Sequence, residues 1–372
     1  MEKQIFIFGK PAEGDNFTDR KEETARLLTN FKGGINTFLL SPRRWGKTSL
    51  VRKVMNEACS QTLKVVFVDV FKCRTPLEFS ETVASAVLSQ TSTRTEEFID
   101  NAKRFLSRIN LGFNVSPDPA NTLELKLGLT RDKDDIKDAL QLVGKIAESK
   151  GINIVVCIDE FQQIADFDDS LAFQKELRTI WQHQPAVSYC LFGSKKHMME
   201  GLFDDESKPF YKFGDVIYLK RIPLKYWNEF IISRFNAAGK TISSDQVKRI
   251  CETVEYHSSY VQQLSWYVFI YSSDIVDTKA IDRAIDELIA QNTPLFESRT
   301  ESMPSYQMNF LRAIASGIHK GFSSAEVIGR FRLGSSANVA AVRKALLDKN
   351  CIFIEDGMTY LADPVLGLWL LR

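Results

Sequence analysis

The chain has 372 residues, which is long enough for more than one folded domain and a sizeable core. Its 48 Lys and Arg residues nearly balance its 47 Asp and Glu residues, so no overall basic field favours nucleic acid or an anionic membrane surface. Its six cysteines include no C-x-x-C pair, so the sequence indicates neither a zinc site nor a disulfide framework. No apolar run is long enough for a signal peptide or a membrane span, so we expect a cytoplasmic protein.

The first predicted helix covers about residues 19–31. Asp19 and Glu22 have the spacing of a capping box at its start. Gly33 and Gly34 follow its last turn and end it.

A phosphate-loop pattern comes next. The apolar run 37–40 predicts a buried strand, and an amphipathic helix follows it. Between them, Ser41-x-x-x-x-Gly46-Lys47-Thr48 matches G-x-x-x-x-G-K-[ST] with Ser in place of the first Gly. This strand-loop-helix context predicts a nucleotide site, because the backbone N–H groups and the dipole at a helix N-terminus favour an anion.

Each residue type in the loop suits a part of this chemistry. Lys47 would pair with the β and γ phosphates of ATP, and the Thr48 hydroxyl would complete a Mg²⁺ shell. Ser41 has a Cβ and tolerates a positive φ poorly, so we expect the start of the loop to be less open than usual. The residues predicted to contact the nucleotide here are Ser41, Pro42, Arg43, Arg44, Trp45, Gly46, Lys47, Thr48 and Ser49.

Short β-branched runs alternate with helical patterns as far as about residue 222. This order predicts a mostly parallel sheet covered by helices on both faces. Apolar residues alternate with others within about 109–130, which predicts a β-hairpin inserted among the helices. The further strands are predicted at 64–70, 154–160, 187–192 and 216–219, and the helices between them at 76–90, 95–107, 133–149 and about 171–181.

The strands stop at about Pro223, and helical patterns continue to about Gln291. Prolines at 294 and 304 bracket a predicted linker. Three helices and two short strands then complete the chain in the order of a winged helix. We therefore predict three domains: a P-loop domain at 1–222, a helical lid at 223–293 and a winged helix at 303–372.

Two carboxylates follow the third strand of the predicted sheet. Ligands bind at the carboxyl ends of parallel strands, so Asp159, Glu160 and Ser194 should lie near Lys47 and Thr48. Asp159 is expected to hold Mg²⁺, and Glu160 to activate a water for attack on the γ-phosphate. Ser194 would donate a hydrogen bond to the γ-phosphate or orient that water. The sequence offers several cations for the transition-state charge and singles out none of Arg178, Lys195, Lys196 and Arg221.

Several stretches resemble one family, the prokaryotic P-loop ATPases called archaeal ATPases, in the larger STAND/AAA+ group. Residues 17–23 are similar to the family's F-x-x-R-x-x-E opening, and 42–50 to its phosphate loop. Residues 158–162 match its DEFQ Walker B, 192–194 resemble its sensor strand, and 360–369 its end of the winged helix.

This resemblance covers nearly the whole chain and implies a fold, a ligand and an activity. The fold is an α/β P-loop NTPase of the AAA+/ASCE class, with sheet order 5-1-4-3-2, a helical lid and a C-terminal winged helix. The ligands are ATP and Mg²⁺, with an adenine-side contact near Phe17 and Arg20. Residues 257–264 of the lid depart from the family because they lack its Gly-x-Pro and a second sensor arginine. Binding of ATP is therefore the firmer expectation, and hydrolysis the next.

Three functions stay open at this point. The first is an ATP-dependent molecular switch that acts on an unidentified protein partner. The second is a DNA-binding winged helix ordered by ATP, which Asn338, Arg343 and Lys344 favour, with Arg330 and Arg332 before them. The acidic residues nearby nearly cancel that charge: Asp348, Glu355, Asp356 and Asp363. The third is a nucleotide-binding scaffold without hydrolysis. The sequence leaves the oligomeric state open.

Overall fold

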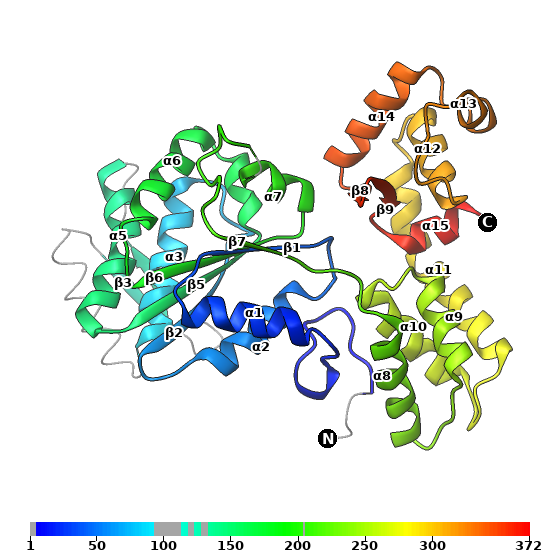
Figure 1. Cartoon of the computed structure of the whole chain (residues 1–372), viewed down its shortest axis with the longest axis horizontal. Helices are drawn as coiled ribbons and strands as arrows, with labels where there is room; N and C mark the ends of the chain where they lie inside the picture. Colours follow the sequence, from blue (N-terminus) through cyan, green and yellow to red (C-terminus); the bar gives the residue numbers. More distant parts are fainter. Residues whose placement is uncertain (1–4, 93–112, 118–122, 128–132, 204) are drawn as a thin grey trace. The chain divides into compact units, whose positions relative to one another are not determined.

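The computed structural model describes the whole chain except residues 1–4, 93–112, 118–122, 128–132 and 204 (Figure 1). The chain divides into two compact units. The ATPase unit contains residues 20–41 and 47–219, and the C-terminal unit contains residues 1–19, 42–46 and 220–372. Within the described residues, no helix combines the length and the apolar character needed to cross a membrane.

A parallel sheet forms the centre of the ATPase unit. In the described part of the chain it has five strands, in the order β2-β5-β6-β1-β7. Numbered along the chain within this sheet, the order is 5-1-4-3-2, as the sequence predicts. The bounds are β1 Thr37–Leu40, β2 Leu63–Asp69, β5 Asn153–Asp159, β6 Val187–Phe192 and β7 Asp215–Tyr218.

Helices cover both faces of this sheet, so its strands are apolar on both sides. Figure 1 shows α1 and α2 along one face and α3, α5, α6 and α7 along the other. Phe38 and Leu40 of β1 join the core under the second group. The helix bounds are α1 Lys21–Lys32, α2 Lys47–Ala58, α3 Pro76–Thr91, α5 Lys133–Lys150, α6 Ser170–Trp181 and α7 Lys196–Phe203.

The start of α1 differs from the sequence prediction. Asp19 and Arg20 both have a left-handed backbone, with φ of 58° and 67°, and no side chain caps the helix. An N-cap residue needs an extended backbone, so Asp19 cannot form the predicted capping box with Glu22. Arg20 instead pairs with Glu23, with 2.9 Å between Nη1 and Oε1.

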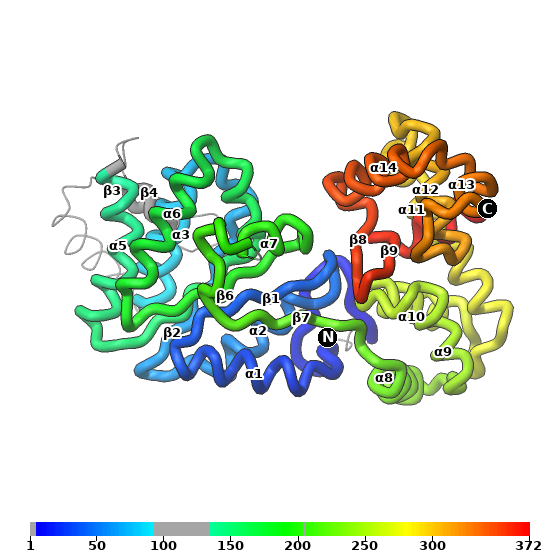
Figure 2. The backbone as a smooth tube through the Cα atoms, turned by 45° about the horizontal axis from the view of Figure 1, so that its top comes forward, coloured from blue at the N-terminus to red at the C-terminus, as the bar shows by residue number. Residues whose placement is uncertain are grey.

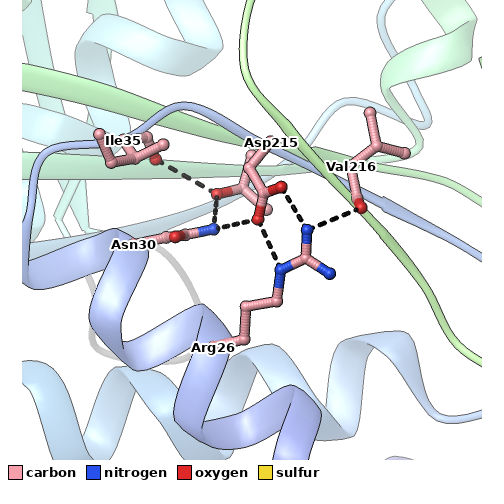
Figure 3. Close-up of polar contacts among 6 residues, drawn as sticks. Arg26, Asn30, Ile35, Asp215 and Val216 are labelled. Carbon is pink, nitrogen blue, oxygen red and sulfur yellow. Dashed lines mark hydrogen bonds and ion pairs between the residues drawn. The ribbon is translucent and has the colours of Figure 1, made fainter.

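A polar cluster joins α1 to the edge strand β7 (Figure 3). Arg26 donates to both carboxylate oxygens of Asp215 and to the carbonyl of Val216. Asn30 donates to the same carboxylate at 2.8 Å. Burial raises the pKa of Asp215, but the bonds from Arg26 and Asn30 outweigh it and leave that pKa below its usual value.

The predicted hairpin is confirmed. Its strands are β3 Phe113–Pro117 and β4 Leu123–Leu127, and they pair antiparallel. The helix predicted at 95–107 lies outside the described residues.

The C-terminal unit begins with a helical part. Its core includes Phe6, whose ring lies 6.2 Å from that of Phe230 and 5.8 Å from that of Phe235. The N-terminal segment is therefore part of this core. The helices are α8 Leu224–Ala237, α9 Ser244–Thr253, α10 Ser258–Tyr271 and α11 Thr278–Thr300 (Figure 2).

The predicted linker around Pro294 is wrong in part, because α11 continues through it to Thr300. Proline removes one helical hydrogen bond. Phe296 and Thr300, two and six residues after the proline, are buried and place the continued helix in the core.

The winged-helix order is confirmed at the end of the chain. A short helix that the sequence analysis does not predict, α15 Pro364–Leu370, follows the last strand, and Asp363 caps it. The other elements are α12 Ser305–Ala315, α13 Ala325–Phe331, α14 Ser336–Asp348, β8 Ile352–Glu355 and β9 Met358–Leu361.

Candidate nucleotide site

Lys47 begins α2 and is almost fully buried, at 6% exposed. Its Nζ donates to the Ser41 carbonyl at 2.9 Å and lies 3.1 Å from the Ser41 hydroxyl. The expectation of a positive φ at Ser41 is wrong, because the positive values in this loop belong to Arg44 and Gly46, at 62° and 96°. The Cβ of Ser41 therefore imposes no left-handed strain, and its hydroxyl contacts the lysine instead.

Thr48 lies beside Asp159, as the sequence predicts. Its hydroxyl donates to Asp159 Oδ2 at 2.9 Å. Burial raises the pKa of Asp159 to about 6, against the opposing effect of the Thr48 hydrogen bond. The negative charge of Glu160 adds to this rise.

Glu160 and Ser194 also lie together. The Ser194 hydroxyl donates to Glu160 Oε2 at 2.8 Å. β5 ends at Asp159, and Glu160 has a left-handed φ of 57°. The chain thus turns after the strand, and the two carboxylates have different partners, Thr48 for Asp159 and Ser194 for Glu160.

The middle of the phosphate loop, Pro42–Gly46, belongs to the C-terminal unit. Trp45 is 3% exposed, and its ring meets that of Phe353 edge-on at 6.1 Å. The Arg221 guanidinium lies 5.5 Å from the centre of the Trp45 ring and 4.8 Å from that of Tyr360. These contacts place Trp45 in an aromatic and cationic environment within the C-terminal unit.

Arg221 also forms two ion pairs within this unit, with Glu355 at 3.2 Å and Glu255 at 3.5 Å. Burial raises the pKa of Glu255, and the charge of Arg221 opposes that rise. Arg178, another candidate cation of the sequence analysis, lies in the ATPase unit with its guanidinium over the Phe213 ring at 4.6 Å.

His257, at the N-cap of α10, holds the same part of the loop. Its ring hydrogen-bonds to the Arg43 backbone, and Nδ1 is buried without a partner among the described residues. Burial lowers the pKa of His257 to about 4, which keeps the ring neutral near pH 7.

The two adenine-side candidates fall in different units. Phe17 is half-buried in the C-terminal unit, where its N–H donates to the Gly14 carbonyl at 3.1 Å. Arg20 is buried in the ATPase unit and pairs with Glu23.

The oxygen donors of the site suit a magnesium ion. Mg²⁺ prefers hard oxygen ligands and usually takes one or two from the protein. Thr48 Oγ1 and Asp159 Oδ2 supply such a pair at the N-terminus of α2. A cation there would offset the burial of the Asp159 charge, so the residues fit the ion.

The sequence alone does not assign a role to Gln162 or to His257. Gln162 lies two residues after Glu160 in the short helix η3 Phe161–Asp166 and donates its amide to Glu160 Oε2. Gln162 is the last residue of the DEFQ motif, which is a signal for it, whereas nothing near the loop in sequence signals His257.

A family model described as an ATPase domain predominantly from Archaea matches residues 17–213. A second model, described as a probable winged helix domain, matches residues 294–372. No curated protein matches the chain.

Solved structures of the same fold cover almost the whole chain. A Walker-type ATPase of Pyrococcus abyssi has a TM-score of 0.69 at 18% identity, over 99% of this chain and 100% of that one. The ORC2 protein of Aeropyrum pernix, solved as ADPNP and ADP complexes, has a TM-score of 0.60 at 13% identity, over 99% and 95%. The ORC1 protein of Aeropyrum pernix in complex with DNA has a TM-score of 0.51 at 13% identity, over 96% and 93%. At these identities the likeness shows the fold alone.

Proposed function

The chain belongs to the family of ATPase domains found predominantly in Archaea, and we propose that it is a Mg²⁺-dependent ATPase that works as a molecular switch. One observation carries the proposal. Thr48, at the start of α2, hydrogen-bonds to Asp159, and Glu160 follows at the turn after the same strand. A phosphate-loop threonine, a Walker B carboxylate and a neighbouring second carboxylate are the parts that ATP hydrolysis requires.

Each residue has a separate task in this proposal. Lys47 leaves Ser41 and pairs with the β and γ phosphates, and the backbone of residues 42–46 and Ser49 surround them. Thr48 and Asp159 would hold Mg²⁺, which would neutralise charge on the phosphate oxygens. Phe17 and Arg20 contact the adenine side.

Glu160 acts as the general base in the chemical step. It accepts a proton from a water whose oxygen forms a bond to the γ-phosphorus. The bond from that phosphorus to the β–γ bridging oxygen breaks, and ADP leaves with the electron pair. Ser194 holds the Glu160 carboxylate through the bond to Oε2. The switch then consists of a change in the lid and winged helix with the nucleotide, read by a protein partner.

The test measures ATP binding and phosphate release on the whole chain. Mg²⁺-ATP should raise the melting temperature, because a ligand that binds only the folded state stabilises it by mass action. EDTA should weaken that shift, and phosphate should accumulate with time. Binding without turnover, in the presence of protein fractions from the native cell as well, would replace the switch by a nucleotide-binding scaffold.

DNA binding is the second candidate, favoured by the Aeropyrum pernix ORC1 structure with DNA. Of Asn338, Arg343 and Lys344, the side chains that favour DNA binding, two make hydrogen bonds within the winged helix. Arg343 donates to the Thr359 hydroxyl, and Asn338 donates to the Leu333 carbonyl. We therefore expect filter binding to duplex DNA across a salt series to show no more than non-specific affinity, with a Kd of roughly 10⁻⁴–10⁻⁶ M.

A further inference from the structure

Two hydrogen bonds end on the same oxygen of the Glu160 carboxylate. Ser194 donates to Oε2 from the turn after β6, and the Gln162 amide donates to it from η3. Among the described residues, neither of these two donors bonds to the second oxygen, Oε1. A carboxylate fixed through one oxygen can present the other to a water in a defined direction.

The side chain of Gln162 is almost completely buried, which is unusual for a polar residue. Its side chain is 1% exposed, and its own Oε1 has no hydrogen-bond partner among the described residues. The reverse orientation of the amide would set two acceptors, Oε1 and the Glu160 carboxylate, against each other, so Nε2 must face Glu160. Burying an amide with one unsatisfied atom lowers stability. The hydrogen bond that Gln162 gains in this position is the one to Glu160.

The backbone next to Ser194 leaves room for this amide. A Cβ at Gly193 would lie 1.7 Å from Gln162 Oε1, far inside any allowed contact. The φ of Gly193 is not positive, so glycine is required here for space rather than for its conformation. The Gln162 amide therefore packs against Gly193, the residue before Ser194, so the two donors to Glu160 lie side by side.

The backbone of Glu160 is fixed as well. Its φ of 57° is unusual for a residue with a side chain. Its N–H donates to Asp159 Oδ1 at 2.9 Å, and its carbonyl accepts from the Gln163 N–H at 2.9 Å. Strained backbone of this kind persists where the surroundings over-determine it, and Gln162 supplies one of those constraints.

We propose that Gln162 is a positioning residue for the Glu160 carboxylate: with Ser194 it holds Oε2, so that Oε1 faces the attacking water. This inference rests on the proposed role of Glu160 as the general base. Gln162 touches neither ATP nor the water and acts through Glu160 alone. Its loss should change the rate of the chemical step and leave ATP affinity as it is.

The test combines Gln162→Leu with Glu160→Gln in a double-mutant cycle. Single-turnover phosphate release from bound ATP should fall ~10-fold to 100-fold in Gln162→Leu, the value of a hydrogen bond to a charged group, with an unchanged Kd for ATP. In the Glu160→Gln background the same substitution should have no further effect, because there is no base left to position.

Gln174→Leu is the matched control. Gln174 is another buried glutamine of the ATPase unit with an unpartnered Oε1, and its amide donates to Ser170 rather than to the site. This variant should hydrolyse at the wild-type rate. If Gln162→Leu does not fold, Gln162→Met keeps a similar length and volume without a donor and takes its place in the cycle.

The outcomes separate this inference from the proposed function. A wild-type rate in Gln162→Leu, or an equal loss with and without Glu160, would overturn the positioning role. A wild-type rate in Glu160→Gln would instead overturn the assignment of the base, and with it the reason to position that carboxylate.

Discussion

The two ends of the phosphate loop and its middle lie in contrasting surroundings. Lys47 and Thr48 contact polar groups of the sheet unit, namely Ser41 and Asp159. The middle of the loop is surrounded by aromatic rings, an arginine and a neutral histidine of the C-terminal unit, and Trp45 is buried. One short motif thus has polar contacts at its ends and aromatic and cationic contacts at its centre.

This contrast predicts that substitutions at the ends change nucleotide binding and turnover, whereas substitutions that loosen the middle change the stability of the C-terminal unit. The following variants test each side of that division, from the largest expected effect to the smallest.

Lys47→Ala should abolish the stabilisation by ATP, which for wild type amounts to about 4 kcal/mol at a ligand concentration of 1,000 Kd. The unliganded melting temperature should change little. Thermal unfolding with and without Mg²⁺-ATP measures both. Lys175→Ala, at an exposed position of α6, is the control and should keep the full shift. A full shift in Lys47→Ala would place the site elsewhere.

Trp45→Ala should lower the stability of the C-terminal unit by about 3 kcal/mol, the cost of removing a buried aromatic side chain. Trp45→Phe should lose less, because an edge-on contact with Phe353 remains possible. Trp266→Ala, at a half-buried position of α10, gives the matched smaller loss. Calorimetry of the unliganded chain measures these losses of stability. An unchanged unfolding transition in Trp45→Ala would contradict the packing of the loop.

His257 should make the stability of the C-terminal unit depend on pH. Its pKa falls from an ordinary value of 6.5 to about 4 in the folded chain, so the unfolded state binds the proton more readily. The stabilisation is fully present above pH 6.5 and is lost as the pH falls to about 4, with a limit of about 3 kcal/mol. His257→Gln should flatten this part of the stability curve, and His183→Gln, at an exposed position, should not. Parallel curves for wild type and His257→Gln would refute the assignment.

Substitutions at Ser41 should have the smallest effect on ATP affinity, and they test whether the start of the loop is strained. Its φ is not positive, so Ser41→Gly and Ser41→Ala should bind ATP with Kd values within about fivefold of each other. Both variants remove the hydroxyl that contacts Lys47 and keep the carbonyl that accepts from it. Much tighter binding by the glycine variant alone would restore the idea of a strained loop start.

The sequence predicted the elements whose signals are local. The strand-loop-helix pattern around Lys47 and the apolar run before Asp159 each fix a short segment, and both segments form as predicted. The sheet order also agrees, although it came from the resemblance to a family rather than from periodicity.

What the sequence could not show depends on contacts between distant segments. The packing of Phe6 against Phe235 places the N-terminal segment in the C-terminal unit, and no pattern within either segment signals it. The helix through Pro294 continues because residues after the proline are buried, which outweighs the local signal for a break. Gln162 is similar: its neighbours in sequence gave a motif, but its role follows from the turn at Glu160 and the space over Gly193.

The predicted domain boundaries remain predictions. The ATPase unit ends at residue 219, close to the expected end of the P-loop domain, and residues 220–372 all belong to the C-terminal unit.

The most direct measurement compares Asp159→Asn with Glu160→Gln for ATP affinity and single-turnover phosphate release in one buffer. Loss of the Mg²⁺ ligand should weaken Mg²⁺-ATP binding itself in Asp159→Asn. Glu160→Gln should bind ATP as wild type does and hydrolyse it ~10²–10⁴-fold more slowly, the usual contribution of a general base. Hydrolysis at the wild-type rate in Glu160→Gln would contradict the account.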